Sequence, residues 1–361
     1  MRRTDKIWWL YQAHNNEINL LFKRFQDDKD FPDNYQVKFL PIITQKNIIE
    51  IISKWLPINY ELEFLSETHQ KIVTLKLSKF STRKQKWFSA IFNIIKYENT
   101  PFNIIFTYER GYIIDSVIKT LFKRFYTEAA NLHISSKQIK ELLFELEKEM
   151  KLDEIITEKV ISYNMKKDKR ETNQKWTNES YETTFEKAMN DNHLVDKIDF
   201  KAYDKNKELF IASLSREGLF KCSRDHISRF YEIVINYLFN IGKFNASIYS
   251  KKSISENDGN IKPISIRFDS PIFTDKIQNE RLLKTLSTFR KSTYSVYHLN
   301  PFFYASLVDY SDGSSYDIWV LSGNKITIIP RIRATFNSLS RLCEHIFQNF
   351  RDGTLEEVAL V

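Results

Sequence analysis

Glycine is scarce in this sequence, and its scarcity limits the folds that the chain can adopt. The 361 residues include 7 glycines and 8 prolines, far fewer than the roughly 7% and 5% of ordinary proteins. Glycine supplies the tight turns of sandwiches and propellers, and it lets a backbone approach a phosphate closely. The sequence therefore argues against a glycine-rich β-sandwich or propeller and against glycine loops around a cofactor.

The motifs of several large enzyme classes are absent. The sequence contains no GK[ST], no GxGxxG, no GxSxG and no HExxH, the patterns that hold phosphates, dinucleotides, a nucleophilic serine or zinc. Cys222 is far from Cys343, and the pair Cys343 and His345 has no second pair to complete a four-ligand zinc site. We expect no ATPase, Rossmann oxidoreductase or zinc enzyme, no disulfide scaffold, no metal and no cofactor.

Charge and hydropathy favour an intracellular protein with an acidic partner. Lys and Arg outnumber Asp and Glu by 54 to 46, a formal net charge of +8, and a basic excess favours nucleic acid or another anionic surface. No stretch reaches the roughly 20 apolar residues of a membrane span. The basic N-terminus leads into only five apolar residues, IWWLY, too few for a signal peptide. We expect a soluble, cytoplasmic protein with no membrane partner.

Hydrophobic periodicity predicts a mixed α+β domain in residues 1–151. Residues 59–65 alternate like a half-buried strand, and 102–108, FNIIFTY, are apolar throughout like a central strand. In 82–97 the apolar residues fall on one side of a helix. The predicted strands are 36–40, 59–65, 71–77 and 102–108, and the predicted helices are 5–26, 45–56, 82–97, 112–130 and 136–151, with Ser136 as a cap of the last.

Residues 152–195 are polar, charged and almost free of aliphatic side chains, which predicts a linker or a long exposed loop. A second α+β domain, 196–361, follows. Its sheet is expected to be mostly antiparallel and to end in a hairpin and a C-terminal helix. The predicted elements are strands at 197–203, 208–214, 264–268 and 293–298, short strands within 302–329, and helices at 224–241, 276–289 and 335–350.

The stretch DYSDGSSYDIWVLSGN, residues 309–324, places Asp309 and Asp317 on two strands joined by a sharp turn. Carboxylates on such hairpins hold metal ions in many nucleases. The usual (Asp/Glu)-x-Lys pattern is missing, however, because Trp319 stands where the lysine would be. The alternatives are a structural hairpin, which we favour, and a divalent-metal nuclease that uses Mg²⁺ on the 306–321 hairpin.

The length of this turn decides between the alternatives. A two-residue loop, Asp312-Gly313, is the commoner hairpin turn, and it would put the two carboxylates on opposite faces. A three-residue loop that begins at Ser311 would put both on one face, within reach of one ion.

Four short clusters combine cations with aromatic residues: FKRF (22–25), TRKQKWF (82–88), FKRFY (122–126) and PRIRATF (330–336). Cations neutralise phosphates and aromatic rings stack on bases, although a buried helix stripe with a solvated rim gives the same pattern. TRKQKWF is the strongest candidate, because its cations would occupy the first turn of a helix. The residues predicted to bind nucleic acid are Arg83, Lys84, Lys86, Lys123, Arg124, Arg331, Arg333 and Arg341.

These observations favour a non-catalytic, nucleic-acid-binding or scaffolding subunit of an intracellular complex. It would hold DNA or RNA through its Lys and Arg clusters and present an aromatic surface to a partner protein. Because the composition is rich in Ile, Lys, Asn and Phe, an accessory role in prokaryotic antiviral defence or in a mobile element is a further guess. The alternatives are the metal-dependent nuclease and a pure protein–protein interaction module.

Overall fold

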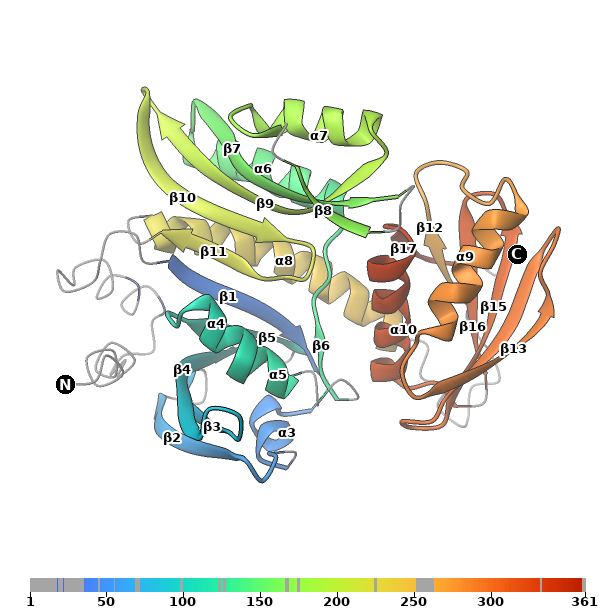
Figure 1. Cartoon of the computed structure of the whole chain (residues 1–361), viewed down its shortest axis with the longest axis horizontal. Coiled ribbons are helices and arrows are strands. Elements are labelled where there is room, and N and C mark those ends of the chain that lie inside the picture. Colours follow the sequence, from blue (N-terminus) through green and yellow to red (C-terminus); the bar gives the residue numbers. More distant parts are fainter. Residues whose placement is uncertain are drawn as a thin grey trace. The chain divides into compact units, whose positions relative to one another are not determined.

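The structure is a computed structural model of the chain, and it describes most residues from Gln36 to Val358. The described residues are 18, 22, 36–44, 46–54, 56–68, 72–97, 100–122, 125, 128–165, 169–173, 176–223, 226–250, 263–331 and 333–358. The chain divides into two compact units (Figure 1): unit 1 is Met1–Phe125 with Asn131–Asn240, and unit 2 is Tyr126–Ala130 with Ile241–Val361. Both units combine helices with antiparallel strands, which confirms the predicted α+β class.

Unit 1 is built on an eleven-stranded antiparallel sheet. Its strands follow the order β2-β3-β4-β5-β1-β11-β10-β9-β7-β8, and β6 pairs with β1 off this path. The strands are β1 (Gln36–Ile43), β2 (Tyr60–Thr68), β3 (Ile72–Ser81), β4 (Lys86–Lys96), β5 (Phe102–Thr107), β6 (Ala130–Asn131), β7 (Glu154–Asn164), β8 (Lys169–Asn173), β9 (His193–Asp204), β10 (Lys207–Ser215) and β11 (Phe220–Ser223).

The central strands carry the core of unit 1. β1 and β5 read QVKFLPII and FNIIFT, and nearly all of their residues are buried, as in strands covered on both faces. Phe39 of β1 packs against Phe106 of β5 and Tyr231 of α8 (Ile227–Ser250), with ring centroids 5.4 and 5.1 Å away. Burial of these rings accounts for much of the stability of the sheet.

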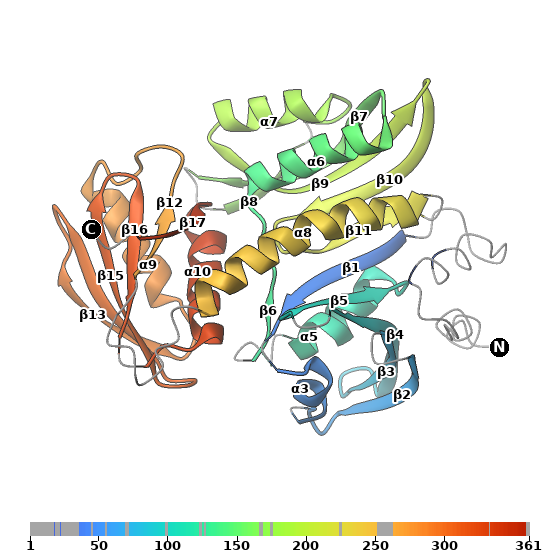
Figure 2. The ribbon, with the colours of Figure 1, turned by 180° about the vertical axis from the view of Figure 1, so that it is seen from behind.

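Helices cover both faces of this sheet. Figure 2 shows α6 (Ser136–Met150) and the first part of α8 across one face of β9, β10, β11 and β1. A continuous helical segment made of α4 (Gly111–Ile113), η1 (Ile114–Ile118) and α5 (Lys119–Phe122) lies on the other face, over β4 and β5 (Figure 1). Two further helices among the described residues of unit 1 are α3 (Ile48–Lys54) and α7 (Tyr181–Asn190).

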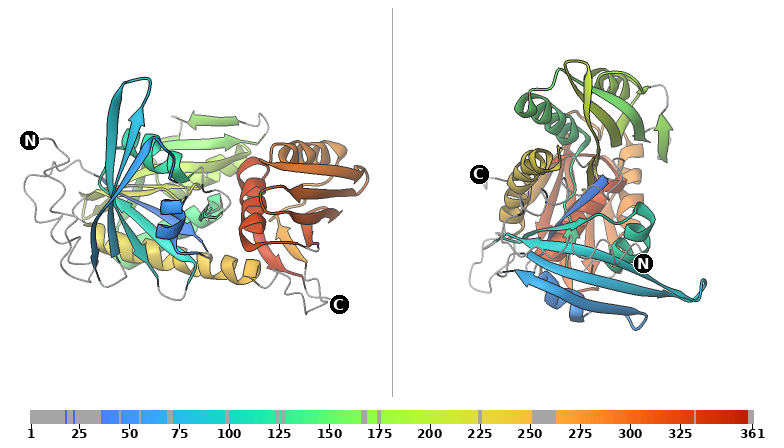
Figure 3. Two further views of the ribbon diagram at one scale, coloured as in Figure 1. Left: turned by 90° about the horizontal axis from the view of Figure 1, so that it is seen from below. Right: turned by 90° about the vertical axis from the view of Figure 1, so that its left-hand side faces the viewer.

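Unit 2 has a six-stranded antiparallel sheet with one face buried under helices. The order is β13-β14-β15-β16-β12-β17. Along β14 the residues alternate between buried and half-buried, and the buried face packs against α9 and α10 (Figure 3). The elements are β12 (Ile264–Arg267), α9 (Lys276–Ser287), β13 (Ser292–His298), β14 (Phe303–Asp309), β15 (Ser314–Ser322), β16 (Lys325–Pro330), α10 (Phe336–Asn349) and β17 (Thr354–Glu357).

The predicted helix at 82–97 is wrong. Residues 82–85 form a turn, and β4 pairs with β3 on one side and β5 on the other. The run from Ala90 to Ile95 is buried throughout, because both faces of this strand are covered. A continuous apolar run satisfies a helical period as well as a strand, so periodicity alone could not separate the two.

The predicted linker at 152–195 is also wrong. These residues form β7, β8, α7 and the start of β9, so they contribute a large part of the sheet of unit 1. The burial of Trp176 and Tyr181, 3% and 1% exposed, shows that a few large rings anchor a segment that is polar on average. Along the sequence, the boundary between the two units therefore lies near residue 240 and not within the predicted linker.

Most other elements lie close to their predicted positions, with shifted ends. α8 continues to Ser250, beyond the predicted end at 241. The cap of α6 is Ser135, not Ser136: Ser135 Oγ accepts the N–H of Gln138 at 3.1 Å. Most of the predicted helix 5–26 lies outside the described residues. No helix in the described ranges is both long and apolar enough to cross a membrane.

Candidate nucleic-acid interface

The hairpin of β3 and β4 brings three of the predicted cations together. Its turn carries Arg83 and Lys84, and Lys86 begins the second strand. The turn is closed by Gln85, which has a φ of 48°, and by Ser81, whose Oγ accepts the N–H of Lys84 at 3.3 Å. The three cations are therefore placed by a hairpin turn and not, as predicted, by the first turn of a helix.

Side chains of the hairpin alternate between two faces. Lys79 lies opposite Phe88 in the strand pairing, and Lys86 is two residues before Phe88, so all three point to one face. On the other face Phe80 packs against Trp87, with ring centroids 5.4 Å apart. Trp87 is 46% exposed, an unusual exposure for so large an apolar ring.

The face with Lys79 and Phe88 forms one wall of an open pocket of about 290 Å³. The other wall is the start of the α4–η1 segment, with Tyr112 and Ser116. Lys79 Nζ donates to Ser116 O at 2.9 Å and so ties the two walls together. The volume lies near the lower end of small-ligand pockets, about 300 Å³. We call this pocket the hairpin groove; Lys79, Ser81, Lys84, Phe88, Tyr112 and Ser116 line it.

The hairpin groove combines positive charge with aromatic rings. Lys84 Nζ and Lys86 Nζ lie 5.4 and 5.0 Å from the centroid of Phe88, within cation–π range. Across the described part of the chain, neither these two lysines nor Lys79 or Arg83 forms an ion pair with a carboxylate. No carboxylate of the described residues therefore neutralises their charge, which is open to an anion.

A π-helical turn shapes the helical wall of this groove. η1 covers Ile114–Ile118, and Ser116 Oγ donates back to Tyr112 O at 2.6 Å. Short π-helical stretches occur often at functional sites. Tyr112 is 57% exposed, so one of its ring faces is accessible from solvent.

The three C-terminal arginines do not form a second basic groove. Arg341 is buried, with 7% of its side chain exposed, and it forms an ion pair with the fully buried Asp309. Arg331 forms an ion pair with Asp317. Arg333 lies beside the hairpin turn, 3.3 Å from the position that a Cβ on Gly313 would take. The prediction that Arg341 contacts a phosphate is therefore wrong, because this side chain is buried and paired. Arg331 already has a carboxylate partner, and the role of Arg333 stays a prediction.

Asp309 and Asp317 lie on opposite faces of the sheet of unit 2. Asp309 pairs with Ser314, and Asp317 pairs with Ser306. Because Ser306 and Asp309 are three residues apart on β14, their side chains point to opposite faces, and Asp317 follows Ser306. The two carboxylates cannot reach one metal ion, which removes the arrangement that the nuclease alternative requires.

The loop between these strands differs from both predicted lengths. It has four residues, 310–313, because Asp309 pairs with Ser314. Asp309 Oδ1 accepts the N–H of Ser311, and Asp312 Oδ1 accepts the N–H of Ser314, both at 2.9 Å. Two aspartates that each fold back on the chain stabilise a longer turn, and Gly313 closes it at a φ of 78°.

Two of the remaining candidates, Lys123 and Arg124, lie outside the described residues. The structure also adds residues that the sequence patterns missed. Lys79 and Tyr112 belong to no basic cluster, and only the pairing of β3 with β4 and the packing of η1 bring them to the groove. One sequence pattern could have located Lys79. If the predicted strand 71–77 is extended to the turn, its alternation of side chains places Lys79 on the same face as Phe88.

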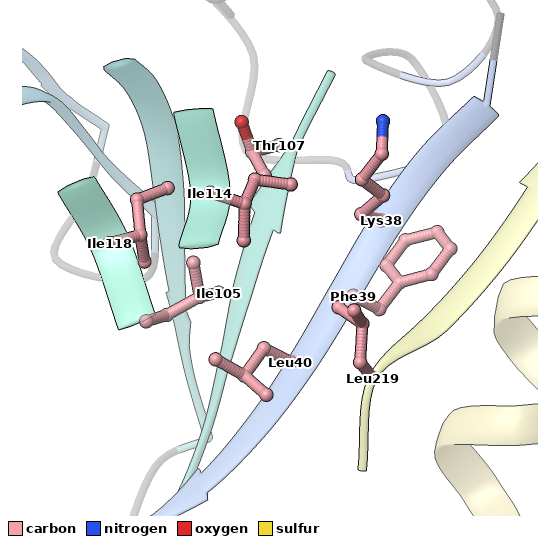
Figure 4. Close-up of a pocket in the computed structure, with 8 residues that line it drawn as sticks. All are labelled: Lys38, Phe39, Leu40, Ile105, Thr107, Ile114, Ile118 and Leu219. Atoms are coloured by element: carbon pink, nitrogen blue, oxygen red, sulfur yellow. The ribbon is translucent and has the colours of Figure 1, made fainter. Parts of the chain in front are cut away.

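A buried lysine lines a small cavity elsewhere in unit 1. Lys38 of β1 projects beside Thr107 (Figure 4), and the cavity measures about 10 Å³, room for no more than one water molecule. Lys38 Nζ donates to Gln36 O at 2.8 Å. Burial, followed by the charge of Lys221, lowers the pKa of Lys38 to about 8. The cavity is too small for a ligand, so the shifted pKa of Lys38 affects the pH dependence of stability and not binding.

In the described part of the chain, no three His, Cys, Asp or Glu side chains are grouped so as to hold a metal ion. No model of a known protein family matches the sequence, and no curated protein is significantly similar to it. The function must therefore be inferred from the geometry of the hairpin groove.

Proposed function

We propose that this protein is a non-catalytic, nucleic-acid-binding subunit that holds a single strand in the hairpin groove. The observation that carries the proposal is the combination of four cations that have no carboxylate partner among the described residues with a pocket walled by Phe88 and Tyr112. Cations that are not neutralised attract the phosphate backbone, and aromatic rings stack on unpaired bases. The positive excess of the whole chain, +8, supports the same partner.

The two walls have different roles in this proposal. Arg83, Lys84 and Lys86 at the hairpin tip contact successive phosphates, because exposed cations at a turn can follow a flexible backbone. A base enters between the rings of Phe88 and Tyr112. A duplex keeps its bases stacked inside, so it can offer only phosphates to this site, whereas a single strand offers both groups.

Filter binding tests the proposal directly. Labelled DNA and RNA oligonucleotides, single-stranded and duplex, are titrated with the full chain at low and at moderate salt concentration. We expect the single strands to bind more tightly than the duplexes and all affinities to fall as salt rises. Equal affinity at both salt concentrations, or no binding, would refute the proposal.

A further inference from the structure

The strand β13 at the edge of unit 2 is unusually exposed. Six of its seven residues, Thr293 to His298, are exposed. Among the described strands its one partner is β14, so within the described structure its outer edge presents backbone N–H and C=O groups without a strand partner. Tyr294 and Val296 are each 38% exposed and Tyr297 is 61% exposed. An exposed edge with apolar side chains is a template for pairing with another strand.

The other sheet edges of the described structure are protected by charge. At the far edge of the same sheet, β17 has only four residues and carries Glu356 and Glu357. The edges of the large sheet are β2, which carries Glu61 and Glu63, and β8, which reads KRETN. Charged residues and short length are the usual devices against edge-to-edge association.

β13 has neither charged residues nor such short length, and its one irregularity is a bulge between Val296 and His298. Its sequence, STYSVYH, contains no Lys, Arg, Asp, Glu or Pro. Among the four terminal strands of the two described sheets, it is the one without such a charge. The contrast in charge within one chain indicates that the regular part of this edge, Ser292 to Val296, is open to pairing with another strand.

We propose that β13 pairs antiparallel with β13 of a second copy of this chain, about a two-fold axis at Ser295. This register places Tyr294 of one copy opposite Val296 of the other, and an aromatic residue opposite a β-branched one is a favourable cross-strand pair. Within β13 no like charges face one another, since the strand has none. A charged edge such as β2 or β17 would instead bring carboxylates against an apolar strand.

The geometry also limits the assembly to two copies. A two-fold contact uses the same strand of both chains, so both β13 edges are consumed. The free ends of the joined sheet are then the two β17 strands, whose glutamates oppose further growth. A strand-to-strand contact of this length falls below the roughly 1,200 Å² of standard interfaces, so we expect a dimer that dissociates on dilution.

Sedimentation velocity over a range of protein concentrations tests self-association. We expect the full chain to shift from monomer to dimer as concentration rises. Val296→Lys weakens association by about tenfold or more, because two lysines would be desolvated at the contact. The matched control is Tyr310→Lys, at a 64% exposed position of the same unit, which should associate as the wild type does. A chain that is monomeric throughout, or a dimer that Val296→Lys leaves intact, would overturn the proposal.

Cross-linking tests the register. Both native cysteines are buried, so a cysteine introduced on the surface is the one accessible thiol among the described residues. Ser295→Cys should form an intermolecular disulfide under mild oxidation, and Ser270→Cys, exposed in a loop of the same unit, should not. A dimeric Ser295→Cys variant that fails to cross-link would contradict pairing about Ser295. Because these experiments involve no nucleic acid, their outcome is independent of the proposed groove.

Discussion

Asp309 at the end of β14 and Arg341 of α10 form an ion pair in the interior of unit 2. Asp309 is fully buried, and its Oδ2, which pairs with Arg341, also accepts a hydrogen bond from Ser338 Oγ at 2.7 Å. The pair thus joins the tip of the hairpin to the helix that covers it. The sequence suggested Asp309 as a catalytic candidate and Arg341 as a nucleic-acid-binding candidate. In the structure the two residues stabilise the fold of unit 2.

Asp309→Asn should strongly destabilise unit 2. The substitution keeps the shape of the side chain but removes the buried negative charge that pairs with Arg341, at a cost of about 3–5 kcal/mol. Asp317→Asn is the matched control on the same hairpin. Its partner Arg331 is half exposed, so the cost should be only about 1 kcal/mol. Urea unfolding followed by circular dichroism measures both, and equal costs would contradict this account of the pair.

Tyr112→Ala should weaken the binding of a single strand. Removal of one stacking ring costs about 1–3 kcal/mol per base, and the ring is 57% exposed, so the fold should not suffer. The control Tyr310→Ala removes a similarly exposed tyrosine of the other unit. It should leave the affinity for the single strand unchanged. Fluorescence anisotropy with a labelled oligonucleotide compares the two, and an unchanged affinity for Tyr112→Ala would exclude base stacking on this ring.

Lys38 should make stability rise with pH. Burial lowers its pKa from 10.5 to about 8. Below about pH 8 the lysine is charged in both the folded and the unfolded chain, and the folded chain bears the full cost of burying that charge. Between about pH 8 and 10.5 the unfolded chain binds the proton that the folded chain has released, so the free energy of unfolding increases by on the order of 3 kcal/mol.

Lys38→Met tests this linkage, because methionine fills a similar space without charge. The variant should be more stable than the wild type near neutral pH, and its advantage should shrink by about 2 kcal/mol as pH rises to about 9.5. Thermal or urea unfolding at several pH values gives the difference. A constant difference across this range would show that Lys38 does not titrate as its burial implies.

Alternation and apolar runs were enough to predict much of the fold. The alternating residues 59–65 lie in β2, and the apolar run 102–108 contains β5. Both strands were predicted from these patterns. The prediction failed in 82–97, where the apolar residues of a strand that follows a turn also fit one side of a helix. The prediction also failed in 152–195, because the average composition of this segment is polar. A few buried side chains, among them Trp176 and Tyr181, pack its strands and helix into unit 1.

The candidate site was predictable in part. The cluster TRKQKWF identified the cations of the hairpin groove, because charge density is visible in sequence. The groove itself depends on Lys79 and Tyr112, which are 33 residues apart by number and meet only through the tertiary fold. The burial of Arg341 could not be predicted from the sequence either, because an arginine can form a buried ion pair or an exposed contact with a phosphate.

Charge reversal at the hairpin tip, measured as the salt dependence of binding, tests the central claim most directly. The double variant Lys84→Glu/Lys86→Glu is compared with Lys205→Glu/Lys207→Glu, which reverses two exposed lysines at the β9–β10 turn of the same sheet and changes net charge equally. Binding of a labelled single strand is followed by anisotropy over a series of salt concentrations. We predict that the first variant loses most of its affinity and that the slope of log K against log salt falls by about 2, one for each lost phosphate contact, while the second variant keeps the wild-type slope. Equal losses in the two variants would show that binding follows net charge alone, and no loss in the first would show that the hairpin groove does not bind nucleic acid.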